Sequence, residues 1–305
     1  MSAGQRVRVG RRTVEVSRLD KVLFPEAGIT KGELIDYYRS VAQLMVPHLR
    51  GRPLALERFP DGLGGDKVFQ QHMPDYFPEW IDAASVPKVS GRDRVRHAVV
   101  NSAAALVYLA NQACITPHAW LARADRPQHP DQLIFDLDPP DGFAAARHAA
   151  LAVRDLLTEL GLRPFVKTTG SKGLHVHVRL DRKAAFDEVR EFATDVARVL
   201  VARYPDRYTT EQRKNQRGGR LYLDVMRNAY AQTAVAPYSV RARDTATVAT
   251  PLAWTELEDD RLTPGQFTLR TLPERIEQHG DAWQDTSHRP KSLTPARKRL
   301  TRLTL

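Results

Sequence analysis

The sequence predicts an α+β fold, with an N-terminal α/β portion followed by a central β-α-β portion. Three observations support this class. Hydrophobic residues make up 42% of the 305 residues, enough to build a sizeable core. From about residue 131, short apolar runs alternate with longer helical patterns, as in strands connected by helices. Before that point, helical patterns flank a stretch rich in glycine and proline. We place the boundary between the two portions near residue 130.

The first helix of the N-terminal portion follows a strand-like run, RRTVEVS. Thr30 and Glu33 form a T-x-x-E capping box, which predicts that the helix begins near Lys31. Its predicted buried face recurs at helical spacing and consists of Leu34, Tyr38, Val41 and Met45. Because proline breaks the hydrogen-bond pattern of a helix, we expect this helix to end before Pro47.

The later elements follow from the same kinds of pattern. Residues 51–75 indicate strand and loop, and residues 101–112 a helix. In the central portion, LIFDLD predicts a strand, and residues 143–160 an Ala- and Leu-rich helix that Gly161 stops. RPFVKTTGSKGLHVHVRL predicts two strands joined by a turn, and an amphipathic helix follows over about 186–200. LYLDVMRN and TAVAPYSVRAR supply two further strand candidates.

The C-terminal residues are basic and lack a regular pattern. From Asp285 onward we expect a loose arm, with residues 291–305 forming a basic tail that contacts nucleic acid without specificity. The cations of the segment from Asp285 onward are Arg289, Lys291, Arg297, Lys298, Arg299 and Arg302.

The whole chain is basic, with 46 Lys and Arg against 36 Asp and Glu and a net charge of +10. That balance favours a polyanionic partner such as nucleic acid, although a merely basic surface explains it equally well. Cys114 is the only cysteine, which excludes an intramolecular disulfide and a thiolate-rich zinc site. The N-terminus lacks a secretory core, and no apolar stretch approaches the roughly 20 residues that span a bilayer. We therefore expect a cytoplasmic protein, at the nucleoid, without a membrane partner.

Two carboxylates occur at the end of the LIFDLD run. Residues two apart in a strand point to the same face, so Asp136 and Asp138 lie side by side. A divalent cation, Mg²⁺ or Mn²⁺, would relieve their repulsion and bind substrate phosphates as well. The alternative is a strand end whose acids cap the following turn.

Asp224 favours the metal site. It lies on the strand-like run LYLDV, whose residues Leu223 and Val225 point to the opposite face, so the acid is a natural third ligand. Three strand carboxylates facing one cleft indicate phosphoryl transfer with two metal ions. An edge-strand acid that faces water remains the alternative for this residue.

The run TTGSKGLHVHV, from Thr168 to Val178, combines hydroxyls, glycines and a lysine before a strand that presents His175 and His177 on one face. Glycines allow backbone amides to approach an anion closely, and Lys172 would neutralise a triphosphate. A plain hairpin is the alternative, because the run lacks the spacing of a P-loop. Beside a strand that carries two acids, we favour phosphate binding.

The chain resembles a known family, the polymerase domain of bacterial ligase D in the archaeo-eukaryotic primase superfamily. The resemblance spans roughly residues 15–260 and is carried, in order, by LDKVLFPEAGITKGELIDYY, ERFPDG, PHAWLAR, IFDLDPP, KTTGSKGLHVHV, RGGRLYLDVMRN and TAVAPYSVRAR. It implies a primase-type catalytic core, in which an N-terminal α/β module (about 1–130) packs on a central RRM-like β-sheet module that binds metal (about 131–290). Residues 1–290 would form one catalytic domain.

The resemblance also implies an activity and its substrates. We expect a nucleotidyltransferase that extends primers, fills gaps and processes broken DNA ends in non-homologous end joining. Two metal ions would serve each active site, with Mn²⁺ favoured over Mg²⁺, and ribonucleotides would be favoured over deoxyribonucleotides.

Individual residues take roles from the same resemblance. Asp136, Asp138 and Asp224 resemble the catalytic, metal-binding triad, with Asp224 placed to receive the proton of the primer 3′-hydroxyl. Thr169 stands where the family usually has serine. The residues that resemble nucleotide-binding groups are His118, Thr169, Ser171, Lys172, His175 and Arg217.

Lys21 and Lys31 resemble the lysines that bind the recessed 5′-phosphate of a gap. Lys31 would lie in the first turn of a capped helix, where free backbone amides and the helix dipole also favour phosphate. A solvated surface charge is the alternative for each lysine. Phe69 resembles one of two adjacent aromatics that stack on the template, and Val68 replaces its neighbour.

Two positions depart from the family's pattern. Arg18 lies where an asparagine or similar polar residue is common, and Glu57 lies where a basic residue is often found. An acid at Glu57 would weaken a phosphate contact at that position.

Other functions remain open. A haloacid-dehalogenase-type phosphatase would use the first acid of D-x-D as a nucleophile, but such enzymes usually begin near the motif and carry Thr or Val where Pro140 stands. A catalytically idle nucleic-acid-binding module of primase descent is the other alternative, although all three acids are present. The chain has no room for ligase and nuclease modules, so we expect a stand-alone polymerase with a separate DNA ligase and the Ku ring as partners.

Overall fold

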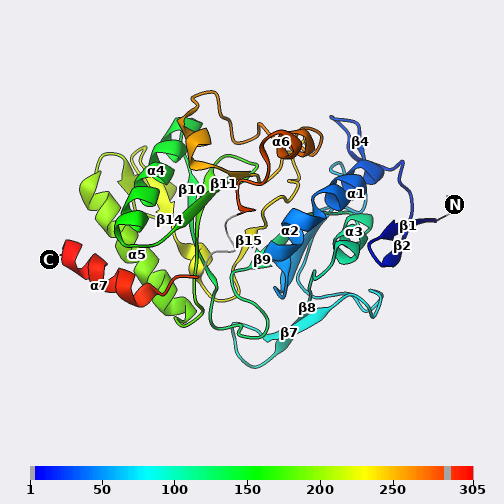
Figure 1. The fold of residues 1–305 in the computed structure, drawn as a ribbon, viewed down its shortest axis with the longest axis horizontal. Helices are drawn as coiled ribbons and strands as arrows, with labels where there is room; N and C mark the ends of the chain where they lie inside the picture. The colour runs from blue at the N-terminus through cyan, green and yellow to red at the C-terminus, as the bar shows by residue number, and fades with distance from the viewer. Residues whose placement is uncertain (1–3, 285–289, 305) are drawn as a thin grey trace. The chain divides into compact units, whose positions relative to one another are not determined.

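The structure, a computed structural model, describes residues 4–284 and 290–304, which form two compact units (Figure 1). Unit 1 comprises the described residues up to Trp120, together with Thr233–Thr250 and Gly265–Asp281. Unit 2 comprises Leu121–Gln232, Pro251–Pro264 and the described residues after Asp281. Two segments that the sequence predicts in the second module, 233–250 and 265–281, therefore lie in unit 1.

Unit 1 is built on a four-stranded antiparallel sheet with the order β15-β9-β5-β6. These strands are β5 (Leu54–Arg58), β6 (Val68–Gln70), β9 (Cys114–Trp120) and β15 (Thr233–Val235). Three hairpins pair β1 (Gln5–Val9) with β2 (Arg12–Val16), β3 (Val22–Phe24) with β4 (Ile29–Thr30), and β7 (Ala83–Pro87) with β8 (Arg94–Ala98). The helices are α1 (Lys31–Ser40), α2 (Ala42–Leu49), α3 (Ala103–Asn111) and α6 (Leu272–His279).

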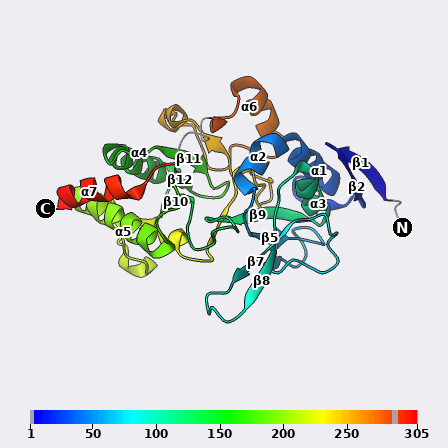
Figure 2. The same ribbon diagram turned by 60° about the horizontal axis from the view of Figure 1, so that its bottom comes forward.

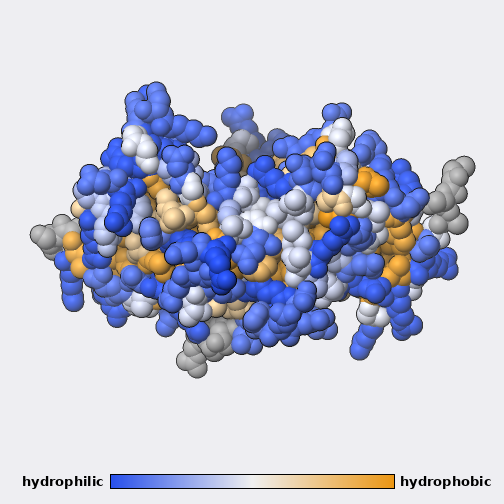
Figure 3. Space-filling view, turned by 90° about the horizontal axis from the view of Figure 1, so that it is seen from above, coloured by the Kyte–Doolittle hydropathy of each residue, from blue (hydrophilic) through white to orange (hydrophobic). Residues whose placement is uncertain are grey.

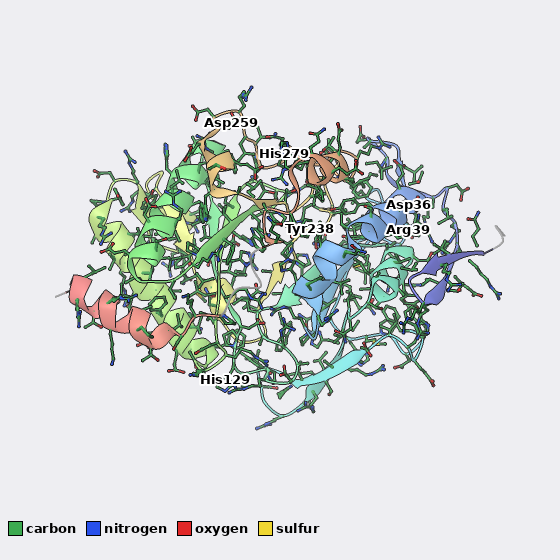
Figure 4. All side chains as sticks on the ribbon, viewed as in Figure 1. Asp36, Arg39, His129, Tyr238, Asp259 and His279 are labelled. Carbon is green, nitrogen blue, oxygen red and sulfur yellow. The ribbon has the colours of Figure 1, made fainter. Side chains whose placement is uncertain are left out.

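The capping box at the start of α1 is confirmed. Thr30 Oγ1 accepts a hydrogen bond from Glu33 N at 3.3 Å, and the Glu33 carboxylate accepts one from Thr30 N at 2.9 Å. The predicted apolar face of this segment is buried, whereas Asp36 and Arg39 lie on the exposed side of α1 (Figure 4).

The predicted end of this helix before Pro47 is wrong. Helix α1 ends at Ser40, and Pro47 lies inside α2. Pro47 and Gln43 are both exposed. The Gln43 carbonyl, which loses its N–H partner to the proline ring, can therefore be hydrated, and the helix continues.

Unit 2 is built on a six-stranded sheet with the order β13-β14-β10-β12-β11-β16. Figure 2 labels three of its strands, β10, β11 and β12. The strands are β10 (Gln132–Asp138), β11 (Pro164–Thr168), β12 (Leu174–Arg179), β13 (Tyr208–Thr209), β14 (Leu221–Asp224) and β16 (Pro251–Leu252). The chain order β10, α4 (Phe143–Glu159), β11, β12, α5 (Phe186–Arg203), β14 gives the central order β14-β10-β12-β11. This is the split β-α-β arrangement, so the α+β class with an RRM-like module is confirmed.

Alternation along β10 separates a core face from a polar face. Phe135 and Leu137 are fully buried, and they lie opposite Val176 and Leu174 of β12. Helices α4 and α5 pack on this sheet and on each other. Asp136 and Asp138 point to the other face, where the remaining polar residues of the sheet can reach them.

The predicted loose arm is wrong over Leu293–Thr304, which form helix α7. Leu293, Ala296 and Leu300 are buried, and α7 packs on α5. Arg299 Nη1 donates to Leu160 O at 2.7 Å, at the C-terminal end of α4, where a cation satisfies a carbonyl that lacks a helical partner. Arg289 lies outside the described residues.

In Figure 3 the visible face consists mostly of hydrophilic residues, with hydrophobic residues showing in smaller patches. Among the residues that the structure describes, no helix is long and apolar enough to cross a membrane.

A side-chain amide extends the sheet of unit 2 beyond the end of β14. That strand ends at Asp224, and the 3₁₀ turn Met226–Asn228 follows. Asn228 is fully buried. Its Oδ1 accepts from Ile134 N at 2.9 Å, and its Nδ2 donates to Ile134 O at 2.7 Å and to Val225 O at 2.8 Å. Asn228 thus takes the place of a strand neighbour for β10, two residues before Asp136.

We expect Asn228→Ala to lower the free energy of unfolding by about 3 kcal/mol, because it leaves both backbone groups of Ile134 buried without these bonds. Urea denaturation followed by circular dichroism measures the difference. The control is Asn215→Ala, an exposed position that should change stability by less than about 0.5 kcal/mol. Equal stabilities of the two variants would contradict the role of Asn228.

Candidate functional site

Four ionisable residues form a row across the centre of the sheet in unit 2. Asp136 on β10 lies opposite Asp224 on β14 and, on its other side, opposite His175 on β12. His175 in turn lies opposite Lys167 on β11. Directly opposite residues share a face of the sheet, and Asp138 joins this face two residues after Asp136. The register therefore brings the three predicted acids to neighbouring positions.

These acids line a cavity of about 470 Å³ in unit 2. Three cations line it as well, so the cavity offers both ligands for a metal ion and groups that neutralise phosphate. Five of its lining residues were predicted from the sequence: Asp136, Asp138, Lys172, Arg217 and Asp224. The others are Pro139, Pro140, Lys214, Gly219 and Tyr222.

Asp136 is nearly buried and is held by two donors. Arg227 Nε donates to Oδ2 at 3.1 Å, and His175 Nε2 lies 3.2 Å from Oδ1. Burial alone would raise the pKa of this carboxyl group, but His175 and Arg227 lower it well below its ordinary value. Asp136 is therefore ionised throughout the neutral range.

Burial and the nearby charge of Lys167 lower the pKa of His175 to about 4. The imidazole is therefore neutral at neutral pH. Because Nε2 faces the Asp136 carboxylate, Nε2 carries the proton and Nδ1 is left as an acceptor. Nδ1 is buried and has no hydrogen-bond partner among the described residues.

The surroundings of the other two acids, Asp138 and Asp224, oppose their negative charge. Burial and the neighbouring carboxylates Asp136 and Asp224 raise the pKa of Asp138. Burial and Asp136 also raise the pKa of Asp224, although its Oδ1 accepts a hydrogen bond from Met226 N at 2.7 Å. Each raised pKa means that ionisation is opposed by the surroundings, and a cation at this place would relieve that opposition.

The donors fit a hard divalent ion, since all three acids supply oxygen ligands. Within the described part of the chain, however, no three His, Cys, Asp or Glu side chains already lie together as a ligand set for one ion. Asp136 is engaged by Arg227 and His175 instead. The structure therefore brings the three acids to one cavity, with Asp136 held by the Arg227 guanidinium and the neutral imidazole of His175.

The turn between β11 and β12 lies directly against the acids. A Cβ atom at Gly173 would lie 2.2 Å from Leu137 O and 2.7 Å from Asp138 Oδ1, so only glycine allows this approach. Thr169 Oγ1 accepts from Ser171 N at 3.3 Å and from Gly173 N at 3.2 Å. It also donates to Gly173 O at 3.2 Å, so its hydroxyl shapes the turn. Thr169 and Ser171 are not among the residues that line the cavity.

Arg217 is held at the cavity by its own loop. Its Nε donates to Glu211 O at 3.1 Å and its Nη2 to Gln212 O at 2.7 Å. The guanidinium also lies over the ring of Tyr222, 4.5 Å from the ring centroid. Tyr222 and Asp224 lie two residues apart on β14 and therefore on the same face of the sheet. The contacts of Arg217 thus fix a positive charge beside Asp224.

His118 and Phe69 belong to unit 1, where the structure brings them together with Glu57. His118 Nε2 lies 3.1 Å from Glu57 Oε2, and the His118 and Phe69 rings make an edge contact at 5.6 Å. Burial alone would raise the pKa of Glu57, but His118, Arg241 and Lys67 lower it. Phe69 is 49% exposed, so its ring is accessible for stacking.

Arg18, Lys21 and Lys31 form a lysine cluster in unit 1. Lys31 is buried, and its Nζ donates to Asn111 O at 3.2 Å and Asn111 Oδ1 at 3.0 Å. Burial and the charges of Arg18 and Lys21 lower the pKa of Lys31 to about 8. The three groups thus make a concentrated positive site.

The expectation of free amides at the start of α1 is wrong. Lys31 N donates to Lys21 O and Gly32 N to Leu19 O, each at 2.8 Å, and Glu33 N donates to Thr30 Oγ1. Any anion at this cluster would therefore be bound by side chains and not by backbone amides.

Three residues of the cavity region were missed by reasoning from the sequence: Arg227, Lys214 and Tyr222. The spacing of Tyr222, two residues before Asp224 on one strand, was a usable signal. Arg227 returns to Asp136 only because residues 226–228 form a 3₁₀ turn, and Lys214 lies on another such turn, Lys214–Gln216. Their positions depend on loop geometry that sequence patterns do not carry.

A family model and several related proteins match most of this chain. A family model described as the LigD primase-polymerase domain matches residues 30–283. The multifunctional non-homologous end joining protein LigD of Mycolicibacterium smegmatis is 36% identical over 272 residues, which are 88% of this chain and 35% of that protein. The bifunctional protein LigD of Bacillus subtilis is 31% identical over 281 residues, 91% of this chain and 45% of that protein. The chain thus spans less than half the length of these two relatives.

The fold is also similar to a solved structure, the polymerase domain from Mycobacterium tuberculosis ligase D in complex with DNA. The similarity has a TM-score of 0.83 and 34% sequence identity, and it covers 89% of this chain and 97% of that one. Together with the match over residues 30–283, it shows that the chain belongs to the LigD primase-polymerase domain family.

Proposed function

We propose that the protein is a DNA-directed nucleotidyltransferase that extends primers to fill gaps and process broken ends. The observation that carries this proposal is the cavity of unit 2, where three strand carboxylates meet three cations. Carboxylate oxygens suit Mn²⁺ or Mg²⁺, and the cations suit a triphosphate. The raised pKa values of Asp138 and Asp224 support the presence of a cation during function.

Asp136, Asp138 and Asp224 would hold two divalent ions, with Mn²⁺ the favoured metal. When bound, such ions supply Lewis-acid activation of the attacking hydroxyl and neutralise charge on the leaving pyrophosphate. Asp224, whose pKa is raised, is suited to receive the proton of the primer 3′-hydroxyl.

The remaining residues would bind the incoming nucleotide. Lys172, Lys214 and Arg217 line the cavity and would neutralise its phosphates. His175 would act on the same site through Asp136, whose carboxylate it holds. We assign His118, Thr169 and Ser171 to nucleotide binding by resemblance, with Thr169 acting through the shape of its turn. Ribonucleotides remain the proposed substrates.

Unit 1 would bind the DNA. Phe69 offers an exposed ring for the template base, and stacking on such a ring contributes about 1 to 3 kcal/mol per base. Lys21 and Lys31 would bind the recessed 5′-phosphate. The similar polymerase domain from Mycobacterium tuberculosis ligase D was solved in complex with DNA, which supports DNA as the partner of this chain.

The family match covers residues of both units, which supports residues 1–290 as one catalytic domain. The relatives are named for non-homologous end joining. We propose the same pathway for this chain, with the Ku ring and a DNA ligase as partners. Incorporation of nucleotide by the wild type would exclude a catalytically idle binding module.

Asp138→Asn should reduce incorporation of labelled nucleotide onto a gapped primer by at least about 100-fold, because it removes a metal ligand at the reacting phosphate. Primer extension with Mn²⁺ measures the rate. Asp138 is a better target than Asp136, because replacing Asp136 would remove the hydrogen-bond partner of both His175 and Arg227.

The matched control is Asp141→Asn, three residues further on, an exposed acid that does not line the cavity. It should keep nearly wild-type activity. A wild type as inactive as Asp138→Asn would leave only the binding-module alternative.

Asp138→Asn should also raise the melting temperature at neutral pH when no divalent metal is present. Because the folded-state pKa of Asp138 is raised above 3.8, its ionised form opposes folding above that value, and asparagine removes the opposition. The gain should shrink as the pH falls through the raised pKa, where Asp138 becomes protonated. It should also shrink when Mn²⁺ is added, because the ion stabilises only the wild-type carboxylate. Thermal melts at several pH values test this, and a gain independent of both pH and Mn²⁺ would contradict it.

A further inference from the structure

The turn Phe59–Gly62 places a carboxylate inside the lysine cluster of unit 1. Lys21 Nζ donates to Asp61 Oδ1 at 2.8 Å and to Pro60 O at 2.5 Å. The position where Lys21 would meet a phosphate is therefore already occupied by an anion of the chain itself.

The turn is built to hold Asp61 in this place. Gly62 N donates to Phe59 O at 3.0 Å, which closes a β-turn with proline at its second position. Leu63 N then donates to Leu23 O at 2.8 Å and ties the turn to β3. The turn is thus anchored on the strand that directly follows Lys21.

Two glycines make this packing possible. Gly62 has a φ of +79°, and a Cβ atom there would lie 2.9 Å from Val22 O. A Cβ atom at Gly65 would lie 2.8 Å from Asp61 Cβ. An incidental ion pair on the surface needs no such accommodation, so the place of Asp61 is a property of the fold.

Charge and exposure make Asp61 a displaceable anion. Its side chain is 79% exposed, whereas the Lys21 side chain is only 24% exposed, so Asp61 can leave without disrupting packed neighbours. The hydrogen bond and charge of Lys21 lower the pKa of Asp61, which keeps it ionised in the neutral range. With Arg18 and Lys31 the cluster has three cations against this one carboxylate, so exchanging Asp61 for a terminal phosphate of charge about −1.5 to −2 brings the cluster closer to neutrality.

We propose that Asp61 is a tethered competitor of the terminal 5′-phosphate: its carboxylate occupies Lys21 in the free protein and is displaced when a phosphate monoester binds. Asp61 thereby sets how tightly phosphorylated ends are held. This inference rests on the proposed 5′-phosphate site at Lys21 and Lys31. No bond forms or breaks in the exchange, which replaces one ion pair with another.

Asp61→Asn tests the proposal, because it keeps the size of the side chain and removes its charge. Fluorescence anisotropy would measure binding to two gapped duplexes that differ only in a 5′-phosphate or a 5′-hydroxyl at the recessed end. The dissociation constant for the phosphorylated gap should fall by about two- to fivefold, the range expected for release of an exposed ion pair. Binding to the hydroxyl gap should change no more than in the control.

The control is Asp93→Asn. It removes the same charge from another exposed pair, in which Lys88 Nζ lies 3.1 Å from Asp93 Oδ2. The loss of this negative charge should strengthen binding to both gaps equally through general attraction to the DNA backbone. For each variant we divide the affinity for the phosphorylated gap by the affinity for the hydroxyl gap. The change in this ratio in Asp61→Asn then isolates the local effect of Asp61.

With a wild type that distinguishes the two gaps, an unchanged ratio in Asp61→Asn would overturn the proposal. A lower ratio would overturn it as well and would show that Asp61 orients Lys21 for phosphate. The double variant Lys21→Ala, Lys31→Ala tests the site itself. If the wild type and this double variant both bind the two gaps equally, the 5′-phosphate site fails, and the role of Asp61 fails with it.

Discussion

The Asp136 carboxylate lies nearly buried in the centre of a sheet, between an imidazole and a guanidinium. A buried charge is strongly unfavourable unless it is paired and hydrogen-bonded. The surrounding strands must therefore supply partners for it, and they do so from both sides of β10. His175 comes from β12, and Arg227 comes from the turn that follows β14. Burial, followed by the charge of Asp136, raises the pKa values of Asp138 and Asp224, so the buried acid adds to the electrostatic demand of the cavity for a cation.

The backbone around Asp136 also positions side chains at the cavity. After Asp224 the chain turns at once, which returns Arg227 to Asp136 and Asn228 to Ile134 within a few residues. On the other side, Gly173 lets the turn after β11 touch the end of β10, so Lys172 reaches the cavity. Loops at this site are thus held by buried hydrogen bonds and close backbone contacts. The lysine cluster of unit 1 follows the same principle, because glycines bring a turn and its acid against Lys21.

Much of this arrangement could be predicted from local patterns. The capping box of α1, the strand of Asp136 and the helices on either side of the β11 and β12 pair are all encoded over short stretches. The register that sets Asp136 opposite Asp224 is not, because it joins distant segments through hydrogen bonds that no spacing reveals. Predictions from local sequence patterns were also wrong for two features that depend on tertiary contacts. The amides of α1 are taken by residues before the helix, and α7 packs through three buried apolar residues although four of its twelve residues are basic.

In the proposed function, Asp136, Asp138 and Asp224 together hold divalent ions beside a triphosphate. Electron paramagnetic resonance of free Mn²⁺, titrated with protein and a non-hydrolysable nucleoside triphosphate and corrected for Mn²⁺ bound by the nucleotide alone, counts the bound ions. We expect two ions for each wild-type chain and the loss of at least one in Asp224→Asn, which retains the hydrogen bond that Met226 N donates to this side chain. The same number of bound ions in the wild type and the variant would contradict the assignment of the triad.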